Sequence, residues 1–323
     1  MRAVIYASFG DPASVLSVEE RPTPEPGPGQ VRVKMRRAAI HNHDLWMIRG
    51  SYGQRPPLPA IGGSEAAGVV EALGDGVTNL RVGDRVAGFA TGAWCESFVA
   101  SAAALVPLPA EMSDDAACQL VAMPLSAMAL LDTYAAPAPD YIVQNAANGA
   151  VGKTLAKLAL GRQSKVINLV RSDTGVRELA DHGVPGAIST ASANWRDSVK
   201  AVVGEGKITC AIDSIAGRAS ADLCSILSPG GRLVAFGSLS GEPMQIDPGA
   251  LIFRQIKVEG FWLSRQNAIP FEKSRLMIGE LVKAVIDRTI DLPVAGVYPL
   301  ERAREAVTAS ASAARGGKVL IEP

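Results

Sequence analysis

The sequence has few cysteines, few aromatic residues and no excess of charge. Its four cysteines are widely scattered and form no Cys-x-x-Cys pair, which suits a reducing compartment better than a disulfide framework, so a cytoplasmic location is expected. The 32 basic and 32 acidic residues balance, and no run of Lys or Arg stands out. Nucleic acid and anionic membranes are therefore poorly supported as main partners.

Long apolar segments are missing as well. The longest apolar run, 120–131, is interrupted by Pro124 and is too short to span a bilayer. Residues 1–9 lack the apolar core of a signal peptide and alternate like an edge strand. An apolar share of 48% with only 5% aromatic residues fits an aliphatic α/β protein. The length suggests about two domains, because single cores stop growing near ~250–300 residues.

Short strands and turns dominate the first 115 residues. Apolar residues alternate with charged ones in three segments, each expected to be a strand with one buried face: 30–35, 68–74 and 84–89. From about Ser113 the pattern changes to helices that alternate with apolar strands. The buried strands are expected at 166–170, 210–213, 232–236 and 256–261. This alternation predicts a parallel sheet with right-handed crossovers.

After Pro270 the chain is expected to be helical again, with a last helix from about Glu301 and a closing strand over 318–321. The prediction is an α/β protein with two domains. A Rossmann domain over 116–269 interrupts a β-rich domain made of 1–115 and completed by 270–323. The active site is expected in the cleft between the domains, outside the carboxyl ends of the parallel strands.

The segment 141–152 reads Tyr-Ile-Val-Gln-Asn-Ala-Ala-Asn-Gly-Ala-Val-Gly. It predicts a buried strand, a glycine-bearing turn and the start of a helix, which is the opening of a dinucleotide-binding unit. Backbone N–H groups of the loop and the N-terminus of the helix would face the pyrophosphate. The signature is degraded at Ala150, where related motifs often have glycine.

Arg171 follows the next predicted strand, at the point where an enzyme that selects NAD usually carries Asp or Glu. A cation there matches the 2′-phosphate of NADP, and Ser172 could donate to the same phosphate. Asp173 is less favourable beside a phosphate, and a solvated residue at a strand end is the other interpretation of Arg171. The pattern predicts an enzyme that uses NADPH.

The layout and motifs resemble the medium-chain dehydrogenase/reductase superfamily across essentially the whole chain. That superfamily joins a GroES-like catalytic domain to a Rossmann domain, and the segment 62–70, Gly-Gly-Ser-Glu-Ala-Ala-Gly-Val-Val, is similar to its GxExxGxV signature. Within it the closer resemblance is to the trans-2-enoyl thioester reductases, the mitochondrial type of enoyl-CoA/ACP reductase. Three stretches carry this resemblance: 48–52, 142–148 with 167–171, and 251–254 with 260–264. Quinone oxidoreductases share the first stretch but usually lack the Gly-Phe-Trp-Leu of the last.

Alcohol dehydrogenases of this superfamily hold a catalytic zinc with Cys, His and Cys. The aligned positions here are His41, Ser64 and Met123, and the four-cysteine structural lobe is absent. A hydroxyl and a thioether are poor zinc ligands, so we expect no metal. His41 and His43, beside Asp44, are expected to be a polar pair in a loop.

The resemblance also implies site residues. Tyr52 matches the family's catalytic tyrosine and, as a phenol with a pKa of ~10, can donate a proton; the alternative is an aromatic residue packed in its loop. Trp94 and Trp262 are expected to line the acyl pocket or else simply to pack. The implied cofactor contacts are Asn148, Gly149, Ala150, Val151, Arg171, Ser172, Phe236, Gly237, Ser238, Leu239, Phe261, Trp262, Leu263 and Lys318. Core packing for Phe236 and Leu263, and a solvated terminal cation for Lys318, are the alternatives.

The function implied is NADPH-dependent reduction of the activated C=C bond of a 2-enoyl thioester. His41 and His43 stand where thioester reductases usually have Asn and Ser, so an NADPH:quinone oxidoreductase or alkenal reductase is the alternative. A non-catalytic NADPH-binding protein is the third hypothesis. The resemblance further implies a homodimer formed through Rossmann sheet edges, for which 256–261 is a plausible strand.

Overall fold

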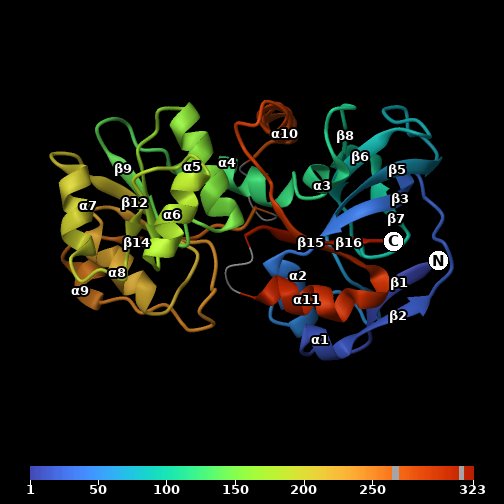
Figure 1. Cartoon of the computed structure of the whole chain (residues 1–323), viewed down its shortest axis with the longest axis horizontal. Coiled ribbons are helices and arrows are strands. Elements are labelled where there is room, and N and C mark those ends of the chain that lie inside the picture. Colours follow the sequence, from blue (N-terminus) through green and yellow to red (C-terminus); the bar gives the residue numbers. More distant parts are fainter. Residues whose placement is uncertain (264–268, 313–315) are drawn as a thin grey trace. The chain divides into compact units, whose positions relative to one another are not determined.

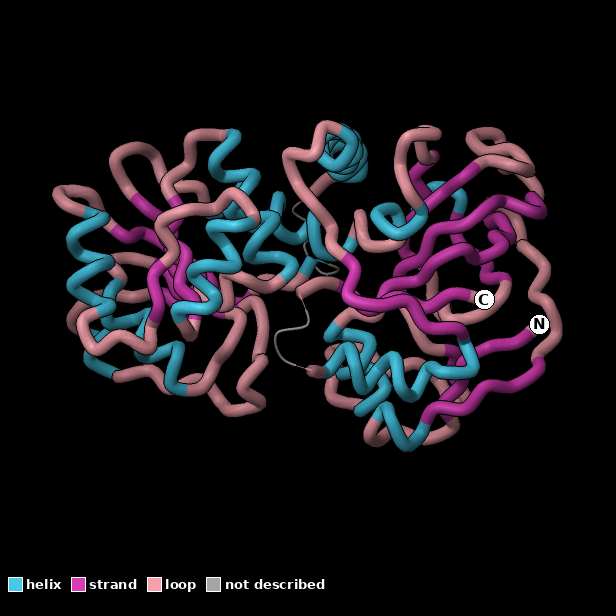
Figure 2. Tube along the Cα trace, viewed as in Figure 1, coloured by secondary structure: helices cyan, strands magenta, loops and turns pink. Residues whose placement is uncertain are grey.

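The computed structural model describes residues 1–263, 269–312 and 316–323. Ser264, the last residue of the 260–264 stretch, lies outside these ranges. The chain divides into two compact units, Met1–Met123 with Ile278–Pro323 (unit 1), and Pro124–Met277 (unit 2). Unit 1 is rich in strands, whereas strands and helices alternate in unit 2 (Figures 1 and 2). No described helix has both the length and the apolar character needed to cross a membrane.

Unit 1 contains two sheets. The smaller has the antiparallel order β2-β1-β4, and the larger has the order β15-β16-β3-β5-β6-β8, with β7 also pairing with β3. The strands are β1 (Arg2–Tyr6), β2 (Leu16–Glu20), β3 (Gln30–Ala39), β4 (Ala60–Ile61), β5 (Glu65–Leu73), β6 (Arg85–Phe89), β7 (Ser97–Ser101), β8 (Leu105–Pro107), β15 (Val294–Pro299) and β16 (Lys318–Glu322). The alternating segments 30–35, 68–74 and 84–89 therefore do form strands, as predicted.

Short helices connect these strands. They are α1 (Pro12–Val15), α2 (Asn42–Arg49), η1 (Ala102–Ala104), α3 (Asp114–Ala117), η3 (Leu300–Arg302) and α11 (Ala303–Ala311). Two longer helices, α4 (Ala122–Tyr134) and α10 (Phe271–Ile286), contain the two points at which the chain passes between the units.

The strand at the beginning of the chain differs from the prediction. β1 pairs with β2 along one side and with β4 along the other, so it is a central strand and not an edge strand. Its residues 3–6 are all buried, which a strand with one solvated face would not show. The last strand, β16, pairs antiparallel with β3 and thus returns to the first part of the chain, as predicted.

Unit 2 is a parallel sheet of six strands in the order β11-β10-β9-β12-β13-β14, with helices in the connections. The order reverses between β9 and β12, which is the switch point of a doubly wound sheet. The elements are β9 (Tyr141–Gln144), α5 (Ala150–Gly161), β10 (Val166–Val170), α6 (Asp173–Asp181), β11 (Ile188–Ser189), α7 (Trp195–Val203), β12 (Ile208–Asp213), α8 (Arg218–Ile226), β13 (Arg232–Ala235), α9 (Pro248–Ile252) and β14 (Lys257–Gly260).

The central strands of this sheet are mainly apolar because helices cover both faces, and the polar residues Gln144 and Asp213 stand at strand ends. Val143 in β9, Ala211 in β12 and Leu233 in β13 are completely buried in one cluster. The predicted parallel sheet is confirmed, and β10 has the predicted bounds.

Gly68, the second glycine of the GxExxGxV signature, lies in β5 opposite Met35 of β3. A Cβ added to Gly68 would lie 2.1 Å from the carbonyl oxygen of Lys34 in the paired strand. Only a residue without a side chain fits this approach, so the signature glycine is a packing requirement of the larger sheet.

We predict that Gly68→Ala destabilises the protein by about 1–3 kcal/mol, since the neighbouring backbone must move. Gly279→Ala is the matched control, because Gly279 lies inside α10 and a Cβ there has no atom within 4 Å. It should instead stabilise the protein by roughly 0.5–1 kcal/mol through helix propensity. Urea denaturation measures both, and equal stability of the two variants would contradict the packing argument.

Candidate functional site

Three partly exposed side chains of unit 1 meet beside the first turn of α2. The rings of His43 and Tyr52 stack with their centroids 5.7 Å apart, and His43 Nε2 lies 2.6 Å from Ser64 Oγ. Tyr52 reaches this place because Gly50, the C-cap of α2, has a φ of 74°. The Tyr52 N–H then donates to the Trp46 carbonyl and folds the chain back. Tyr52, His43 and Ser64 thus form a polar cluster, in which the imidazole and the serine hydroxyl can both form hydrogen bonds.

A second, buried layer supports this cluster. The His41 ring stacks on that of His43 with a centroid distance of 5.0 Å, and its Nε2 lies 2.8 Å from Glu65 Oε2. Glu65 is completely buried, and its carboxyl oxygens accept the N–H groups of Val121 and Ala122. Burial raises the pKa of Glu65 to about 8, although both N–H groups oppose the shift. The carboxyl group thereby connects the start of β5 with the start of α4.

The surroundings of His43 keep its ring neutral near pH 7. Burial lowers the pKa of His43, Asp44 opposes this shift, and the charge of Lys318 adds to it. Asp44 is 1% exposed, and its Oδ2 accepts the N–H of His41 at 2.8 Å. Its other oxygen, Oδ1, lies 3.7 Å from His43 Nε2. A neutral imidazole in this position can donate one hydrogen bond and accept another.

Lys318, the first residue of β16, is 5% exposed and is therefore not a solvated terminal cation. Its Nζ lies 3.4 Å from the Ile40 carbonyl oxygen. Its charge acts on both Glu65 and His43, so it lies close to the polar cluster of unit 1.

Trp94 has no exposed surface, and its Nε1 donates to the Ala39 carbonyl at 3.2 Å. Its indole packs so closely on Gly62 and Gly63 that a Cβ at either glycine would lie within 2.4 Å of the ring. This burial contradicts a place in an acyl pocket. The side chain fills the core of unit 1. In the sequence, the pair Gly62 and Gly63 at the start of the GxExxGxV segment was the only local signal for this packing.

In unit 2 the glycine-bearing loop between β9 and α5 leaves the N-terminus of α5 open. Gly149 is the N-cap of the helix, and both Gly149 and Ala150 are exposed. Gly152 packs inward, where a Cβ would lie 2.7 Å from the backbone of Ala147. The side chain of Asn148 donates to Glu178 of α6 at 2.9 Å. The loop therefore offers backbone N–H groups and not side chains to an anion.

Arg171 and Ser172 follow β10, the strand next to β9 in this parallel sheet, so they lie at the same edge as the loop. Arg171 is exposed. Ser172 is the N-cap of α6, where its Oγ accepts the N–H of Gly175 at 3.3 Å. Because that contact uses only a lone pair, the Ser172 hydroxyl proton can still be donated. Asp173 is exposed in the first turn of the helix.

A buried polar network, which the sequence did not reveal, supports the middle of this edge. Asp213, at the end of β12, is completely buried, and its Oδ1 accepts from the Asn145 side chain at 2.7 Å. The same oxygen accepts the N–H groups of Ile215 and Ala216, both at 2.9 Å. The sequence did contain one signal of this network. Asp213 ends an apolar strand, and Asn145 follows the end of the neighbouring strand.

The remaining predicted cofactor contacts follow β13 and β14 at the same edge. Gly237 allows close packing, since a Cβ there would lie 2.7 Å from the Ser214 carbonyl oxygen. The rings of Phe236 and Phe261 lie 6.0 Å apart, which agrees with a packing role for both. The structure thus brings these predicted residues of unit 2 to one edge of its sheet: Asn148, Gly149, Ala150, Val151, Arg171, Ser172, Phe236, Gly237, Ser238, Leu239, Phe261, Trp262 and Leu263.

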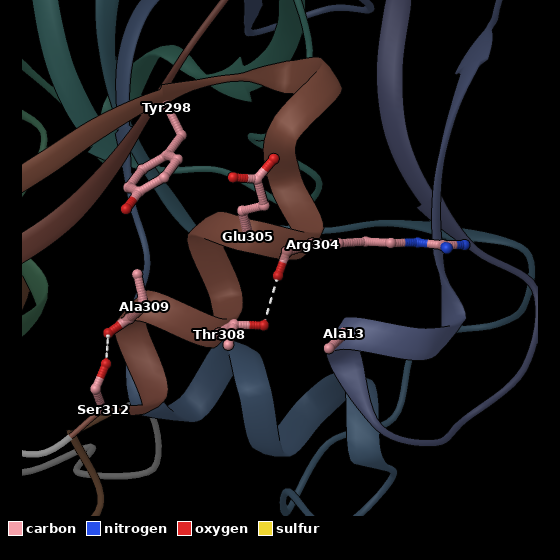
Figure 3. A pocket seen from close by; sticks show the side chains of 7 residues that line it. All are labelled: Ala13, Tyr298, Arg304, Glu305, Thr308, Ala309 and Ser312. Atoms are coloured by element: carbon pink, nitrogen blue, oxygen red, sulfur yellow. Dashed lines mark hydrogen bonds between the residues drawn. The ribbon is translucent and has the colours of Figure 1, made fainter.

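A shallow hollow on unit 1 lies along α11 (Figure 3). Two of its hydroxyls are already used within the helix region, because Thr308 donates to the Arg304 carbonyl and Ser312 to that of Ala309. None of the predicted site residues lines it. The hollow is therefore separate from both candidate site regions.

Comparisons with known proteins agree with this division of the chain. Residues 27–110 match a family model described as the alcohol dehydrogenase GroES-like domain, and residues 150–276 match one described as zinc-binding dehydrogenase. The predicted fold class, a GroES-like β-rich domain with a Rossmann domain, is confirmed.

Three similar proteins cover nearly the whole chain. The mitochondrial enoyl-[acyl-carrier-protein] reductase of Mus musculus is 30% identical over 319 residues, which are 96% of this chain and 85% of that protein. A solved structure named as a putative NADPH:quinone reductase from Bacillus thuringiensis is 28% identical with a TM-score of 0.91, covering 100% and 98% of the two chains. Escherichia coli quinone oxidoreductase, solved with NADPH, is 26% identical with a TM-score of 0.90 and full coverage of both chains.

The second family description names zinc, and the residues of this chain do not fit that metal. The aligned positions offer His41, whose Nε2 faces Glu65, a serine hydroxyl held by His43, and the Met123 thioether. Zinc sites use thiolate, imidazole or carboxylate ligands. Within the described ranges no group of three or more His, Cys, Asp and Glu side chains is placed to bind a metal ion.

Proposed function

This chain belongs to the medium-chain dehydrogenase/reductase superfamily, and on that premise we propose that it is an NADPH-dependent reductase of the activated C=C bond of a 2-enoyl thioester, an enoyl-CoA or enoyl-ACP. The observation that carries the proposal is the polar cluster around Tyr52, in a chain that is 30% identical to a mitochondrial enoyl-[acyl-carrier-protein] reductase over 96% of its length. The cluster offers neutral hydrogen-bond donors, which this chemistry needs.

NADPH, when bound, supplies a hydride to the β-carbon of the enoyl group. The negative charge then moves to the thioester oxygen, where hydrogen-bond donors lower the barrier, and a proton must reach the α-carbon. Tyr52 is suited to this work because a phenol with a pKa of ~10 remains protonated at neutral pH. The stacked His43 ring fixes the direction in which the phenol points.

The carboxyl edge of the unit 2 sheet fits the cofactor. The open N-terminus of α5 would bind the pyrophosphate, since its first N–H groups have no partner within the helix. Arg171 and Ser172 would bind the 2′-phosphate, one by charge and the other by its hydroxyl proton. Asp173 and Glu178 lie nearby on α6, and their negative charges would repel the phosphate. Lys318 is proposed as a further cofactor contact on the resemblance alone.

We predict that the purified protein oxidises NADPH with crotonyl-CoA or a longer enoyl-CoA, and that Tyr52→Phe lowers kcat by about 10²-fold or more. Tyr298→Phe is the matched control, because Tyr298 is a partly buried tyrosine of unit 1 that is stacked by Arg302 and lies outside the polar cluster. Steady-state absorbance at 340 nm, a property of NADPH, follows the reaction. No oxidation at high enzyme concentration would eliminate the thioester assignment.

The second candidate is an NADPH:quinone oxidoreductase or alkenal reductase. Two quinone reductase structures are 28% and 26% identical to the chain, and the stacked pair His41 and His43 is not the Asn and Ser usual in thioester reductases. Turnover of quinones or alkenals with inert enoyl-CoA would favour this candidate. Tight binding of NADPH without hydride transfer to any acceptor, and no effect of Tyr52→Phe, would instead indicate a non-catalytic protein.

We predict that Arg171→Gln raises the KM for NADPH by about 10–100-fold and leaves the KM for NADH nearly unchanged, because a hydrogen bond to a charged group contributes about 1.5–3 kcal/mol. Arg177→Gln is the control, since Arg177 is equally exposed but lies farther along α6. If Arg177→Gln raises the KM for NADPH as much as Arg171→Gln does, the effect of Arg171 comes from the overall charge of this surface and not from a direct contact with the phosphate. A wild-type preference for NADH would contradict the proposal itself.

We propose a homodimer that forms along β14. This strand pairs only with β13 in the described sheet, and apolar side chains stand exposed on or beside it: Ile252 at 60%, Phe253 at 82% and Val258 at 40%. An open apolar edge is covered in many proteins by a second strand. Light scattering should give a dimer for the wild type and a monomer for Phe253→Glu. Leu276→Glu, at a 71% exposed site of α10, should leave the dimer intact.

A cytoplasmic location remains part of the proposal. All four cysteines are free and buried, as expected for a reducing compartment. The partner proposed for the site is a small molecule, either an acyl thioester or a quinone.

A further inference from the structure

Ser64 occupies the middle position of the three that align with zinc ligands, and its hydroxyl has one described partner, His43 Nε2 at 2.6 Å. Both side chains are partly exposed, His43 by 18%. The hydroxyl has one proton to donate and two lone pairs. Which group donates across the 2.6 Å contact decides whether that proton is available to a ligand.

The buried Asp44 carboxylate indicates the answer. Its Oδ1 lies 3.7 Å from His43 Nε2 and has no hydrogen-bond partner among the described residues. The negative charge at 3.7 Å disfavours a lone pair on Nε2 and favours an N–H there, although the N–H itself points to Ser64. We therefore assign the Nε2–H tautomer to His43, which makes His43 the donor and Ser64 Oγ the acceptor.

With its lone pair occupied by His43, the Ser64 hydroxyl directs its own proton away from the imidazole. Ser64 Oγ thus contacts the edge of the His43 ring at Nε2, while the Tyr52 ring stacks on the same imidazole. The hydroxyl is a neutral donor in a partly desolvated position, where a hydrogen bond to developing negative charge is stronger than in water.

We propose that Ser64 is a second catalytic donor, whose hydroxyl binds the carbonyl oxygen of the acceptor and stabilises the enolate formed on hydride transfer, and that His43 is its positioning residue. This inference rests on the proposed reduction of a carbonyl-conjugated C=C bond. Ser64 stabilises charge without losing its proton, and the proton that completes the reaction reaches the α-carbon from Tyr52 or water. Electrons balance, since the hydride pair becomes the new C–H bond and the former π pair moves towards the carbonyl oxygen.

The test compares Ser64→Ala with Ser64→Thr, which keeps the hydroxyl, in the full-length protein. Ser64→Ala should lower kcat by about 10²-fold with little change in KM, as removal of one oxyanion donor does. Ser64→Thr should retain activity within a few-fold. With NADPH deuterated at the transferred position, the isotope effect on kcat should rise in Ser64→Ala, because hydride transfer becomes more fully rate-limiting. NADPH binding, measured by fluorescence titration, should not change.

His43 is tested by two substitutions that separate its ring from its N–H group. His43→Phe keeps a ring stacked between His41 and Tyr52 but removes the donor to Ser64, and it should reproduce the loss seen in Ser64→Ala. His43→Gln keeps an N–H donor and should recover at least part of the activity. The double variant His43→Phe with Ser64→Ala should be no slower than Ser64→Ala alone, because both changes remove the same interaction.

The results separate this inference from the proposed function. An active wild type with unimpaired Ser64→Ala, or a ¹⁵N spectrum that places the His43 proton on Nδ1, overturns the inference and leaves the proposed function standing. A wild type that reduces neither enoyl-CoA nor quinone overturns both. A loss in Ser64→Ala that appears only as weaker NADPH binding also overturns the inference, since a donor to the acceptor carbonyl does not contact the cofactor.

Discussion

The buried carboxyl group of Glu65 is the contact on which the site in unit 1 depends. It ties together three segments that are distant in the sequence: the start of β5, the residue before α2 and the start of α4. Burying a charged carboxylate is costly unless partners compensate for the lost water. Here two backbone N–H groups and an imidazole are the partners. Burial raises the pKa of this group to about 8, so desolvation outweighs the two backbone N–H groups that favour its charged form.

Three stacked rings connect Glu65 to the partly exposed Tyr52. His41 is fixed by Glu65, His43 stacks on His41, and Tyr52 stacks on His43. Each ring limits the rotation of the next, so a phenol in a bend of the chain is held by a completely buried acid. Groups that stabilise a transition state act best when they need no reorganisation, and supporting contacts of this kind provide that condition. The glycines beside the signature contribute indirectly, since Gly62 and Gly63 admit the Trp94 ring that fills the core behind the strand.

The sequence was sufficient to predict elements whose pattern is local. The parallel sheet followed from apolar strands alternating with helices. The loop at Gly149 followed from a glycine-bearing turn between a strand and a helix, and Arg171 from its position at the end of the next strand. Contacts between distant segments could not be predicted in this way. His41, Glu65 and Val121 lie at the starts of three different elements, and only the fold brings them together. For Trp94 the sequence left a pocket position and core packing open, because an aromatic residue in a loop looks the same whether it lines a pocket or fills a core. The central position of β1 depends on β4, a strand of two residues that carries no pattern of its own.

The donor set also explains why a scaffold shared with zinc enzymes suits a different class of acceptor. Hydride addition to an isolated carbonyl places the full charge of an alkoxide on one oxygen. In a conjugated enoyl thioester or quinone the charge spreads over several atoms before a proton arrives, so neutral hydrogen bonds from hydroxyl groups are adequate. Ser64 and Tyr52 are hydroxyls of this kind, held by a neutral imidazole between them. The residues at the former ligand positions therefore favour acceptors whose own conjugation carries the charge.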